Sequence, residues 1–370
     1  MRKDKVIKIL TINTVGLNTN GITTVMFDYY SRFSIEQFDI HTITDVSNDK
    51  SIVDNFKSAG IMVHKLPNRK KSIIRYFISL IILIYSNKFD VVHVHGNSAT
   101  ESIELLAAKL AGCKVRIAHS HNSTCDAKRA DNILRPLFYR LYTHAFACGQ
   151  LAGEWLFQDR YFKIVKNGRD INKYSFDEKT RFKVRKDLGL DETTLAVGHI
   201  GNFNKQKNHE YLIKIFEELK KIKRKSKLFL AGYGHCEKEI HNMVRQLNLE
   251  QDVIFLGGIN NVSSILQAMD IMVLPSLYEG LPLVVVEWQI AALPCVISDT
   301  ITQECVYTDL VEFEKLESSY HSWAVKIIQL AIRNRIESKD YALKQSVLCG
   351  FDINSNSTEL MSYIKNLVHK

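Results

Sequence analysis

The strongest pattern for chemistry is a pair of acidic residues, Glu279 and Glu287, with seven residues between them. Glu279 follows the apolar run Ile271–Leu274, which predicts a strand, and Gly280 and Pro282 lead into a predicted helix. The first-turn amides of a helix have no helical acceptors, so they suit an anion such as a diphosphate. The spacing alone also fits a simpler interpretation, in which acidic residues at a helix start complement its dipole.

A second pattern is the segment Gly201–His209, GNFNKQKNH, which directly follows the predicted strand Leu195–Ile200. A glycine turn, two lysines and a helix start resemble a phosphate-binding loop, although the segment is not a Walker A sequence. Lys207 is the better candidate cation because the predicted helix begins next to it. Solvated surface lysines remain the alternative. Gly232, in the turn after the predicted strand Leu228–Ala231, would allow a ligand to approach the backbone closely.

Four histidines end two neighbouring strands of the first half. His93 and His95 close one predicted strand, and His119 and His121 close the next. Active sites lie at the carboxyl ends of parallel strands, so at least one of these rings could line a ligand site. Zinc is disfavoured because no cysteine or carboxylate completes a ligand set. A histidine held by neighbouring backbone groups is the alternative for each ring taken singly.

Strand and helix signals alternate along the first half and then restart, which predicts two doubly wound parallel sheets. After the first strand, Ile7–Ile12, the turn Asn18–Gly21 leads into a helix, and Gly21 could expose amide donors to a ligand or form an ordinary turn. The other predicted strands of the first half are Ile40–Ile43, Ile61–Leu66, Val91–His95, Val115–His119, Ala145–Cys148 and Phe162–Val165, and those of the second half are Leu195–Ile200, Leu228–Ala231, Val253–Leu256, Ile271–Leu274 and Cys295–Ile297.

A chain of 370 residues is too long for one ordinary core. The segment Asp170–Asp191 is polar and has no sustained apolar period, so we place the domain boundary there. The expected domains are residues 1–170, residues 171–350, and a C-terminal helix in residues 351–370 that returns to the first domain. The predicted fold is α/β, with two Rossmann-like domains facing each other across a cleft.

The charge is uneven, because Met1–Lys186 carries 30 basic and 17 acidic residues in a chain of net charge +9. This suggests an anionic partner, such as a membrane surface, a lipid diphosphate or nucleic acid, and a solvated basic surface is the alternative. No motif supports nucleic-acid binding. The apolar run Ile73–Ile84 follows Arg69, Lys70 and Lys71, and it is too short to span a bilayer. It predicts a core helix, with an interfacial helix as the alternative.

The seven cysteines form no C-x-x-C pair and lie mostly in apolar runs, and no signal peptide is evident. We therefore expect a cytoplasmic protein, attached peripherally to the inner face of the membrane if the basic half binds lipid.

At these motifs the chain resembles the retaining glycosyltransferases of the family-4 type, with the GT-B fold, and is similar to enzymes of capsular and exopolysaccharide assembly. The resemblance runs over nearly the whole chain. Its most specific part is Glu279-Gly280-Leu281-Pro282 through Glu287, together with Val165-Lys166-Asn167-Gly168 and His119-Ser120-His121-Asn122.

The resemblance implies a role for each matching residue. Glu279 would hold hydroxyls of the donor sugar, and Glu287 would bind the donor ribose. Lys207 would neutralise the leaving diphosphate, helped by amides of the turn Gly280–Leu283, which also contains Leu281 and Pro282. His121, with His119 as the second choice, would contact the donor sugar near its reacting carbon, and Gly21 would approach the diphosphate.

The same resemblance implies the substrates. A hexose or N-acetylhexosamine would pass from a UDP-sugar to a glycan or a polyprenyl-diphosphate-linked acceptor, without a metal or other cofactor. The missing Asp-x-Asp motif agrees with metal independence. One departure is Asn202, which stands where many relatives carry arginine after the glycine. A neutral side chain there leaves Lys207 as the main cation.

Two other functions remain open from the sequence. A non-hydrolysing nucleotide-sugar epimerase shares the two-domain architecture, but it needs carboxylates for proton exchange that the first half does not clearly supply. A non-catalytic scaffold that partners an active transferase is the second, and Asn202 is the one residue that favours it.

Overall fold

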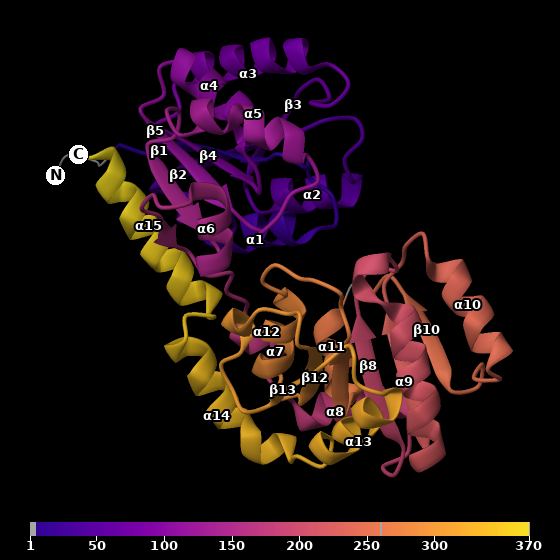
Figure 1. Cartoon of the computed structure of the whole chain (residues 1–370). Coiled ribbons are helices and arrows are strands. Elements are labelled where there is room, and N and C mark those ends of the chain that lie inside the picture. Colours follow the sequence, from indigo (N-terminus) through magenta and orange to yellow (C-terminus); the bar gives the residue numbers. More distant parts are fainter. Residues whose placement is uncertain (1–4, 260, 370) are drawn as a thin grey trace. The chain divides into compact units, whose positions relative to one another are not determined.

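The computed structural model describes residues 5–259 and 261–369, and the chain divides into two compact units (Figure 1). The first unit contains the chain up to Gly168 together with the segment from Asp352 onward, and the second contains Arg169–Phe351. These divisions lie close to the boundaries expected from the sequence. Both units are Rossmann-like, so the predicted fold class is confirmed.

The first unit is built on a parallel sheet of seven strands among its described residues. Strand order reverses between β1 and β4, so this pair forms the switch point at which doubly wound sheets bind ligands. From edge to edge the strands are β3 (Met62–Lys65), β2 (Phe38–Thr44), β1 (Ile7–Asn13), β4 (Val91–Gly96), β5 (Val115–Ser120), β6 (His144–Ala147) and β7 (Lys163–Ile164).

Helices cover both faces of this sheet, with α3, α4 and α5 grouped on one side and α1 and α2 on the other (Figure 1). The right-handed crossovers of parallel strands produce this division. The helical segments of the unit are α1 (Gly21–Tyr30), α2 (Lys50–Ser58), α3 (Ile73–Asn87), the 3₁₀ turn η1 (Ala99–Glu101), α4 (Ser102–Leu110), α5 (Lys128–Phe138), α6 (Gln150–Phe157) and α15 (Ile353–Val368).

Helix α15 belongs to the first unit although it lies at the end of the chain. Asp352 caps it by accepting hydrogen bonds from the amides of Asn354 and Ser355. It packs along α1, where Arg32 donates a hydrogen bond to Asn354 at 2.9 Å. The last helix therefore packs beside the first helix of the unit, α1.

The second unit has a parallel sheet of six strands within its described part, and its order reverses between β8 and β11. From edge to edge the strands are β10 (Val253–Gly257), β9 (Ser226–Ala231), β8 (Leu195–Ile200), β11 (Ile271–Leu274), β12 (Cys295–Ser298) and β13 (Val311–Glu314). Its helical segments are α7 (Ile171–Tyr174), α8 (Glu178–Asp187), η2 (Lys205–Lys207), α9 (His209–Ile222), α10 (Glu237–Gln246), α11 (Val262–Ala268), α12 (Leu283–Ile290), η3 (Gln303–Cys305), α13 (Tyr320–Leu330) and α14 (Arg335–Leu348).

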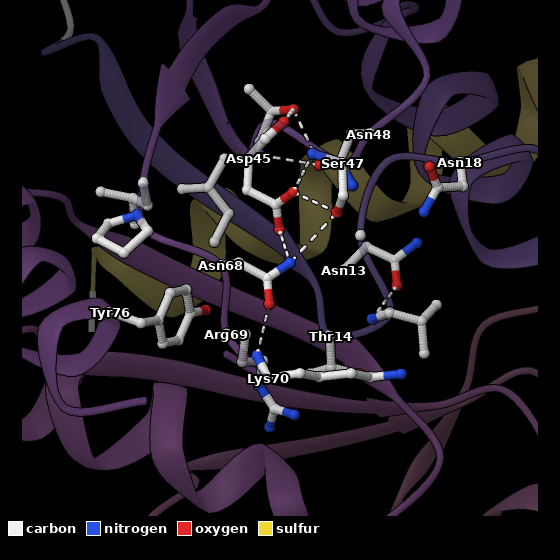
Figure 2. A pocket seen from close by; sticks show the side chains of 16 residues that line it. Asn13, Thr14, Asn18, Asp45, Ser47, Asn48, Asn68, Arg69, Lys70 and Tyr76 are labelled. Atoms are coloured by element: carbon white, nitrogen blue, oxygen red, sulfur yellow. Dashed lines mark hydrogen bonds between the residues drawn. The ribbon is translucent and has the colours of Figure 1, made fainter. Parts of the chain in front are cut away.

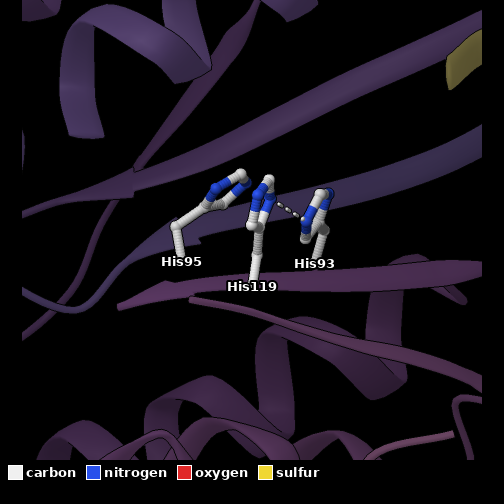
Figure 3. Close-up of side chains that lie close together, drawn as sticks. All are labelled: His93, His95 and His119. Carbon is white, nitrogen blue, oxygen red and sulfur yellow. Dashed lines mark hydrogen bonds between the residues drawn. The ribbon is translucent and has the colours of Figure 1, made fainter. Parts of the chain in front are cut away.

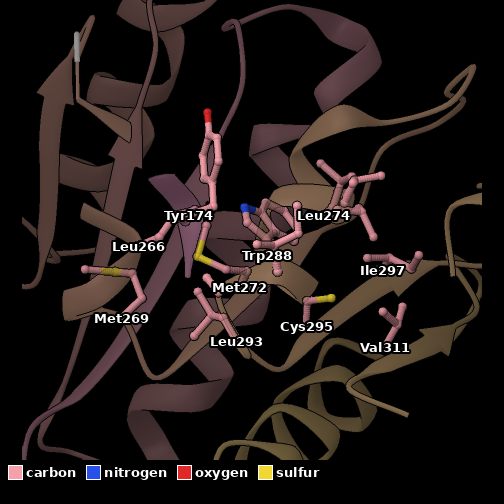
Figure 4. Packing of buried hydrophobic residues seen from close by; sticks show 14 of the residues in the cluster. Tyr174, Leu266, Met269, Met272, Leu274, Trp288, Leu293, Cys295, Ile297 and Val311 are labelled. Atoms are coloured by element: carbon pink, nitrogen blue, oxygen red, sulfur yellow. The ribbon is translucent and has the colours of Figure 1, made fainter. Parts of the chain in front are cut away.

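The core of the second unit fixes α12, the helix that follows Glu279. Trp288 is fully buried and lies among Met272, Leu274 and Cys295 from the two strands beneath it (Figure 4). Burial of large aromatic and aliphatic side chains is the main favourable term in such packing. Val285, Val286 and Ile290 of the same helix are also buried in this core, so the loop before α12 leads into a firmly packed helix.

The segment Asp170–Asp191, in which the sequence places the domain boundary, folds into α7 and α8 within the second unit. Arg185 of α8 is buried and forms an ion pair with Asp270, with an N–O distance of 3.1 Å, and Arg181 pairs with the same carboxylate. Helix α8 is largely charged, and these ion pairs help to hold it to the core beside Val184, so a hydrophobic period did not reveal it.

Candidate active site

The loops after β8 and β9 approach each other closely at the carboxyl edge of the second sheet. Gly232 has φ = +142°, and a Cβ atom there would lie 2.1 Å from the carbonyl oxygen of Gly201. No side chain fits at that position without moving the backbone. Gly232 therefore acts as a spacer that lets the Gly201–Lys207 loop lie against its neighbour, and Asn202 on this loop is exposed.

Lys207 and Glu279 form an ion pair at the switch point between β8 and β11. The Nζ atom of Lys207 lies 2.6 Å from Oε1 of Glu279, and both side chains are largely buried. Gln206 donates from Nε2 to Oε2 of Glu279 at 3.2 Å and to the carbonyl of Tyr278 at 3.0 Å. Two loops that are about 70 residues apart in the chain thus converge on one carboxylate.

The segment from Gly280 to Leu283 connects this carboxylate to α12. Pro282 is the N-cap of the helix, and Leu283 is its first residue. Leu281 packs against the apolar core, which anchors the turn. The first amides of α12 have no acceptors within the helix, so they offer donors to an anion close to Lys207 and Glu279.

Glu287 lies apart from this pair, one turn into α12, and it is nearly buried. Its Oε1 atom lies 2.5 Å from Nη2 of Arg169, which also donates to the hydroxyl of Tyr174 at 2.7 Å. Burial raises the pKa of that hydroxyl, with the Glu287 carboxylate as the second cause, so Tyr174 remains protonated. The sequence expectation did not include Arg169, which follows the Asn167–Gly168 turn directly.

The four histidines of the first unit form a stack at the carboxyl ends of β4 and β5. The Nε2 atom of His93 lies 3.1 Å from Nδ1 of His119, and Nδ1 of His95 lies 2.9 Å from Nε2 of His121. The rings of His119 and His121 stack at 4.1 Å. Figure 3 shows His93, His95 and His119 side by side, and the planes of His93 and His119 are nearly parallel, at 8°.

Burial keeps these rings neutral. It lowers the pKa of His93, His95 and His119 well below its usual range, with the neighbouring imidazoles as the next cause, and it lowers that of His121 to about 3. His121 is the partly exposed member of the stack, so it is the one that a ligand could reach. At neutral pH it would offer a neutral imidazole.

His93, His95 and His119 could also be considered as metal ligands, because one nitrogen from each lies within 4.8 Å of the others. Both ring nitrogens of His93, however, are used in hydrogen bonds, one of them with the hydroxyl of Tyr30 at 2.6 Å. A metal would have to break this chain of bonds. The geometry favours a hydrogen-bonded stack that orients His121.

The first unit also has a polar pocket beyond the carboxyl ends of β1, β2 and β3 (Figure 2). Its volume is about 180 Å³. Asn68 donates from its amide to Asp45 at 2.9 Å and to the hydroxyl of Ser47 at 3.2 Å. Amide, hydroxyl and carboxylate groups in such a pocket fit a ligand rich in hydroxyls. The predicted site residues did not include these side chains.

Gly21, the remaining predicted residue, is the exposed first residue of α1. Asn20 caps this helix by accepting from the amide of Thr23 at 2.9 Å. The structure thus brings Lys207, Glu279, Gly232 and the Gly280–Leu283 turn together in the second unit, and it stacks His119 with His121 in the first.

Two family models match the chain, one in each unit. Residues 14–148 match the model described as "Glycosyl transferase 4-like", and residues 180–337 match "Glycosyl transferases group 1". The chain is therefore a glycosyltransferase. It belongs to the family-4 type of these enzymes, and its two Rossmann-like units are those of the GT-B fold.

Relatives match over nearly the full length. A putative glycosyltransferase, EpsF, of Bacillus subtilis is 29% identical over 94% of each chain. The UDP-Gal:alpha-D-GlcNAc-diphosphoundecaprenol alpha-1,3-galactosyltransferase of Escherichia coli is 25% identical over 98% of each. Among solved structures, Anabaena HepE in complex with UDP superimposes with a TM-score of 0.80 at 17% identity, over 97% of this chain and 100% of HepE. At that identity, the last similarity shows the fold alone.

Proposed function

We propose that this glycosyltransferase transfers a hexose or N-acetylhexosamine from a UDP-sugar to a glycan or lipid-linked acceptor, with retention of configuration and without a metal. The Lys207–Glu279 pair at the switch point carries this proposal, because a buried cation beside free helix-start amides is suited to a diphosphate. The UDP complex of HepE and the UDP-Gal donor of the E. coli relative support the choice of nucleotide.

The roles in donor binding follow from this placement. Lys207 and the amides near Gly280 and Leu283 would stabilise the charge that develops on the departing diphosphate. Glu279, released from part of its bond to Lys207 when phosphate arrives, would accept hydroxyl groups of the donor sugar. Glu287, which pairs with Arg169, would bind the ribose of the donor.

In the reaction, the bond between the anomeric carbon and the phosphate oxygen breaks, and the acceptor oxygen forms the new bond on the same face of the sugar. The proton of the acceptor hydroxyl passes to the leaving phosphate oxygen, so no separate base is required. His121, held by His95, would contact the donor sugar as a neutral hydrogen-bonding group. Gly21 would bring amides of α1 to the diphosphate.

For the acceptor we propose the polar pocket of the first unit, where Asp45, Asn68 and Lys70 line one wall. The acceptor of the E. coli relative is a sugar on diphosphoundecaprenol. We therefore propose a lipid-linked acceptor in capsular or exopolysaccharide assembly, at the inner face of the membrane. No helix among the described residues is long and apolar enough to cross a membrane.

The test is a screen of nucleotide sugars by thermal shift, followed by NMR of the product. A donor at 100 times its Kd should stabilise the fold by about 2.7 kcal/mol. Retention predicts that the anomeric configuration of the donor survives in the product. An isomerised nucleotide sugar without a new glycosidic bond would identify an epimerase instead, and the absence of any stabilising donor would refute the proposal.

A further inference from the structure

Helix α3 has an apolar face that no described part of its own unit covers. Its inner face packs through Tyr76, Leu80 and Ile84, which are buried. Its outer face carries a row of exposed apolar side chains. These are Ile74 (72% exposed), Ile78 (51%), Ile82 (59%) and Tyr85 (72%).

The spacing of this row places it on one face of the helix. Residues four apart advance by about 40° around an α-helix, so Ile74, Ile78 and Ile82 form a narrow line, and Tyr85 falls within it. The expected core helix is thus only half correct, because one side of the run is core and the other is exposed. Isoleucines that were needed only for packing would not be repeated along the outer line.

The charges around this row all have one sign. Lys71 and Arg75 lie on the exposed side at the start of α3, and Lys88 follows its end. From Asn55 to Phe89 the chain contains seven lysines and arginines and no aspartate or glutamate. Arg69, however, is turned inward to Glu104, at 2.6 Å, so it is not part of the exposed basic group.

We infer that the outer face of α3 docks on the surface of an anionic lipid bilayer, with its isoleucines in the acyl boundary and its basic ends among the headgroups. This inference rests on the proposed function in one respect, because a lipid-linked acceptor lies at such a surface. The apolar line flanked by cations is the pattern of an interfacial helix.

Other occupants fit less well. Two copies of this face meeting around a twofold axis would bring basic ends together, with no carboxylate on α3 to neutralise them. A bilayer-spanning orientation is excluded by length, since 15 residues of helix cover about 22 Å against about 30 Å of hydrocarbon. The helix must therefore lie in the plane of the interface.

The experiment is sedimentation of the full chain with vesicles of phosphatidylglycerol and phosphatidylethanolamine, at 0.1 M and 1 M salt. We expect binding at low salt and a smaller bound fraction that resists high salt, since only the charge interaction is screened. Changing Lys71→Ser and Arg75→Ser should weaken low-salt binding roughly 25-fold, at about fivefold per basic residue. The matched control, Lys183→Ser with Lys186→Ser on α8, removes the same charge from exposed positions of the second unit and should have little effect.

The apolar contribution is tested by Ile74→Ser, Ile78→Ser and Ile82→Ser together. This variant should lose the salt-resistant fraction, whereas Ile332→Ser with Ile336→Ser, at exposed positions of the second unit, should keep it. A Tyr85→Trp variant gives an independent measurement, because its fluorescence should be quenched by lipids brominated on the acyl chain.

Three results would overturn the inference: no vesicle binding by the wild type, unchanged binding of the triple isoleucine variant, or a dimer that this variant abolishes without any effect of lipid. Thermal shift with UDP is measured on the same samples. Because nucleotide binding involves the second unit, it reports on the proposed function separately from the lipid result.

Discussion

The buried histidines predict a loss of stability in mild acid, most simply in the second unit. His199 and His209 lie in its core with ring centroids 4.6 Å apart. Burial lowers the pKa of His199 to about 4, and it lowers that of His209 to about 2, with the neighbouring His199 and then Lys207 as further causes. Both rings are thus neutral in the folded protein between pH 7.5 and 5.5.

The sign follows from proton linkage. The pKa of each ring is about 6.5 in the unfolded chain and lower in the folded one, so below pH 6.5 the unfolded state binds more protons. The stabilising contribution is complete above that pH and is lost as the pH falls toward the folded pKa. Between pH 7.5 and 5.5 the free energy of unfolding should fall by about 1.4 kcal/mol for each ring and by about 2.7 kcal/mol for the pair.

Urea unfolding of the second unit at pH 7.5, 6.5 and 5.5 would measure this loss. The variant His209→Phe should reduce the loss by about 1.4 kcal/mol. Neither ring nitrogen of His209 has a hydrogen-bond partner, and its ring stacks on Phe203 at 4.2 Å, so an apolar ring suits the position. His235→Gln is the control, because that side chain is exposed.

Equal unfolding free energies for the wild type at pH 7.5 and 5.5 would refute the reasoning, as would a pH dependence that His209→Phe leaves unchanged. The same logic applies to His121 in the first unit, whose neutral state the proposed sugar contact requires.

Three further predictions concern the active site. Glu279→Gln should lower turnover at least tenfold while UDP binds as well as before, because the carboxylate is assigned to the sugar. Calorimetry with UDP measures nucleotide binding, and a transfer assay measures turnover. A variant with the turnover of the wild type would refute the assignment. Excess EDTA should leave activity intact, since Lys207 and the helix amides are expected to replace a metal; loss that magnesium or manganese restores would contradict this. Gly232→Ala should destabilise the second unit by about 1–3 kcal/mol and weaken UDP binding, because the new Cβ atom would meet the Gly201 carbonyl. Gly189→Ala is the control, because Gly189 also has a positive φ but no atom within 4 Å of a Cβ placed there. This control should lower the stability less and leave UDP binding unchanged.

The central strands could be predicted because parallel strands that are buried on both faces consist of continuous apolar residues. Leu195–Ile200 and Ile271–Leu274 have the boundaries expected from the sequence. The apolar residues of the sequence predict a helix around Ile133–Tyr142, whereas α5 spans Lys128–Phe138. Pro136 lies inside this helix, and charged residues fill its first turn, so the apolar period appears only in its second half.

Spacing could identify Lys207 and Glu279 as candidates but not as partners. Their ion pair depends on the adjacency of β8 and β11, and strand order is a property of the whole sheet. Arg169 was missed for a related reason, since nothing nearby in the sequence indicates a bond to a residue more than a hundred positions away. The outward face of α3 could not be separated from core because both of its faces are apolar.

The central claim is that Lys207 binds the diphosphate of the donor, and calorimetry with UDP and with uridine tests it most directly. Lys207→Met should weaken UDP binding roughly 10- to 150-fold, which corresponds to about 1.5–3 kcal/mol for a hydrogen bond to a charged group, and should leave uridine binding unchanged. Lys205→Met, on the same loop and exposed, should change UDP affinity no more than a few fold. If Lys207→Met binds UDP as tightly as the wild type, the assignment of this loop to the diphosphate is wrong.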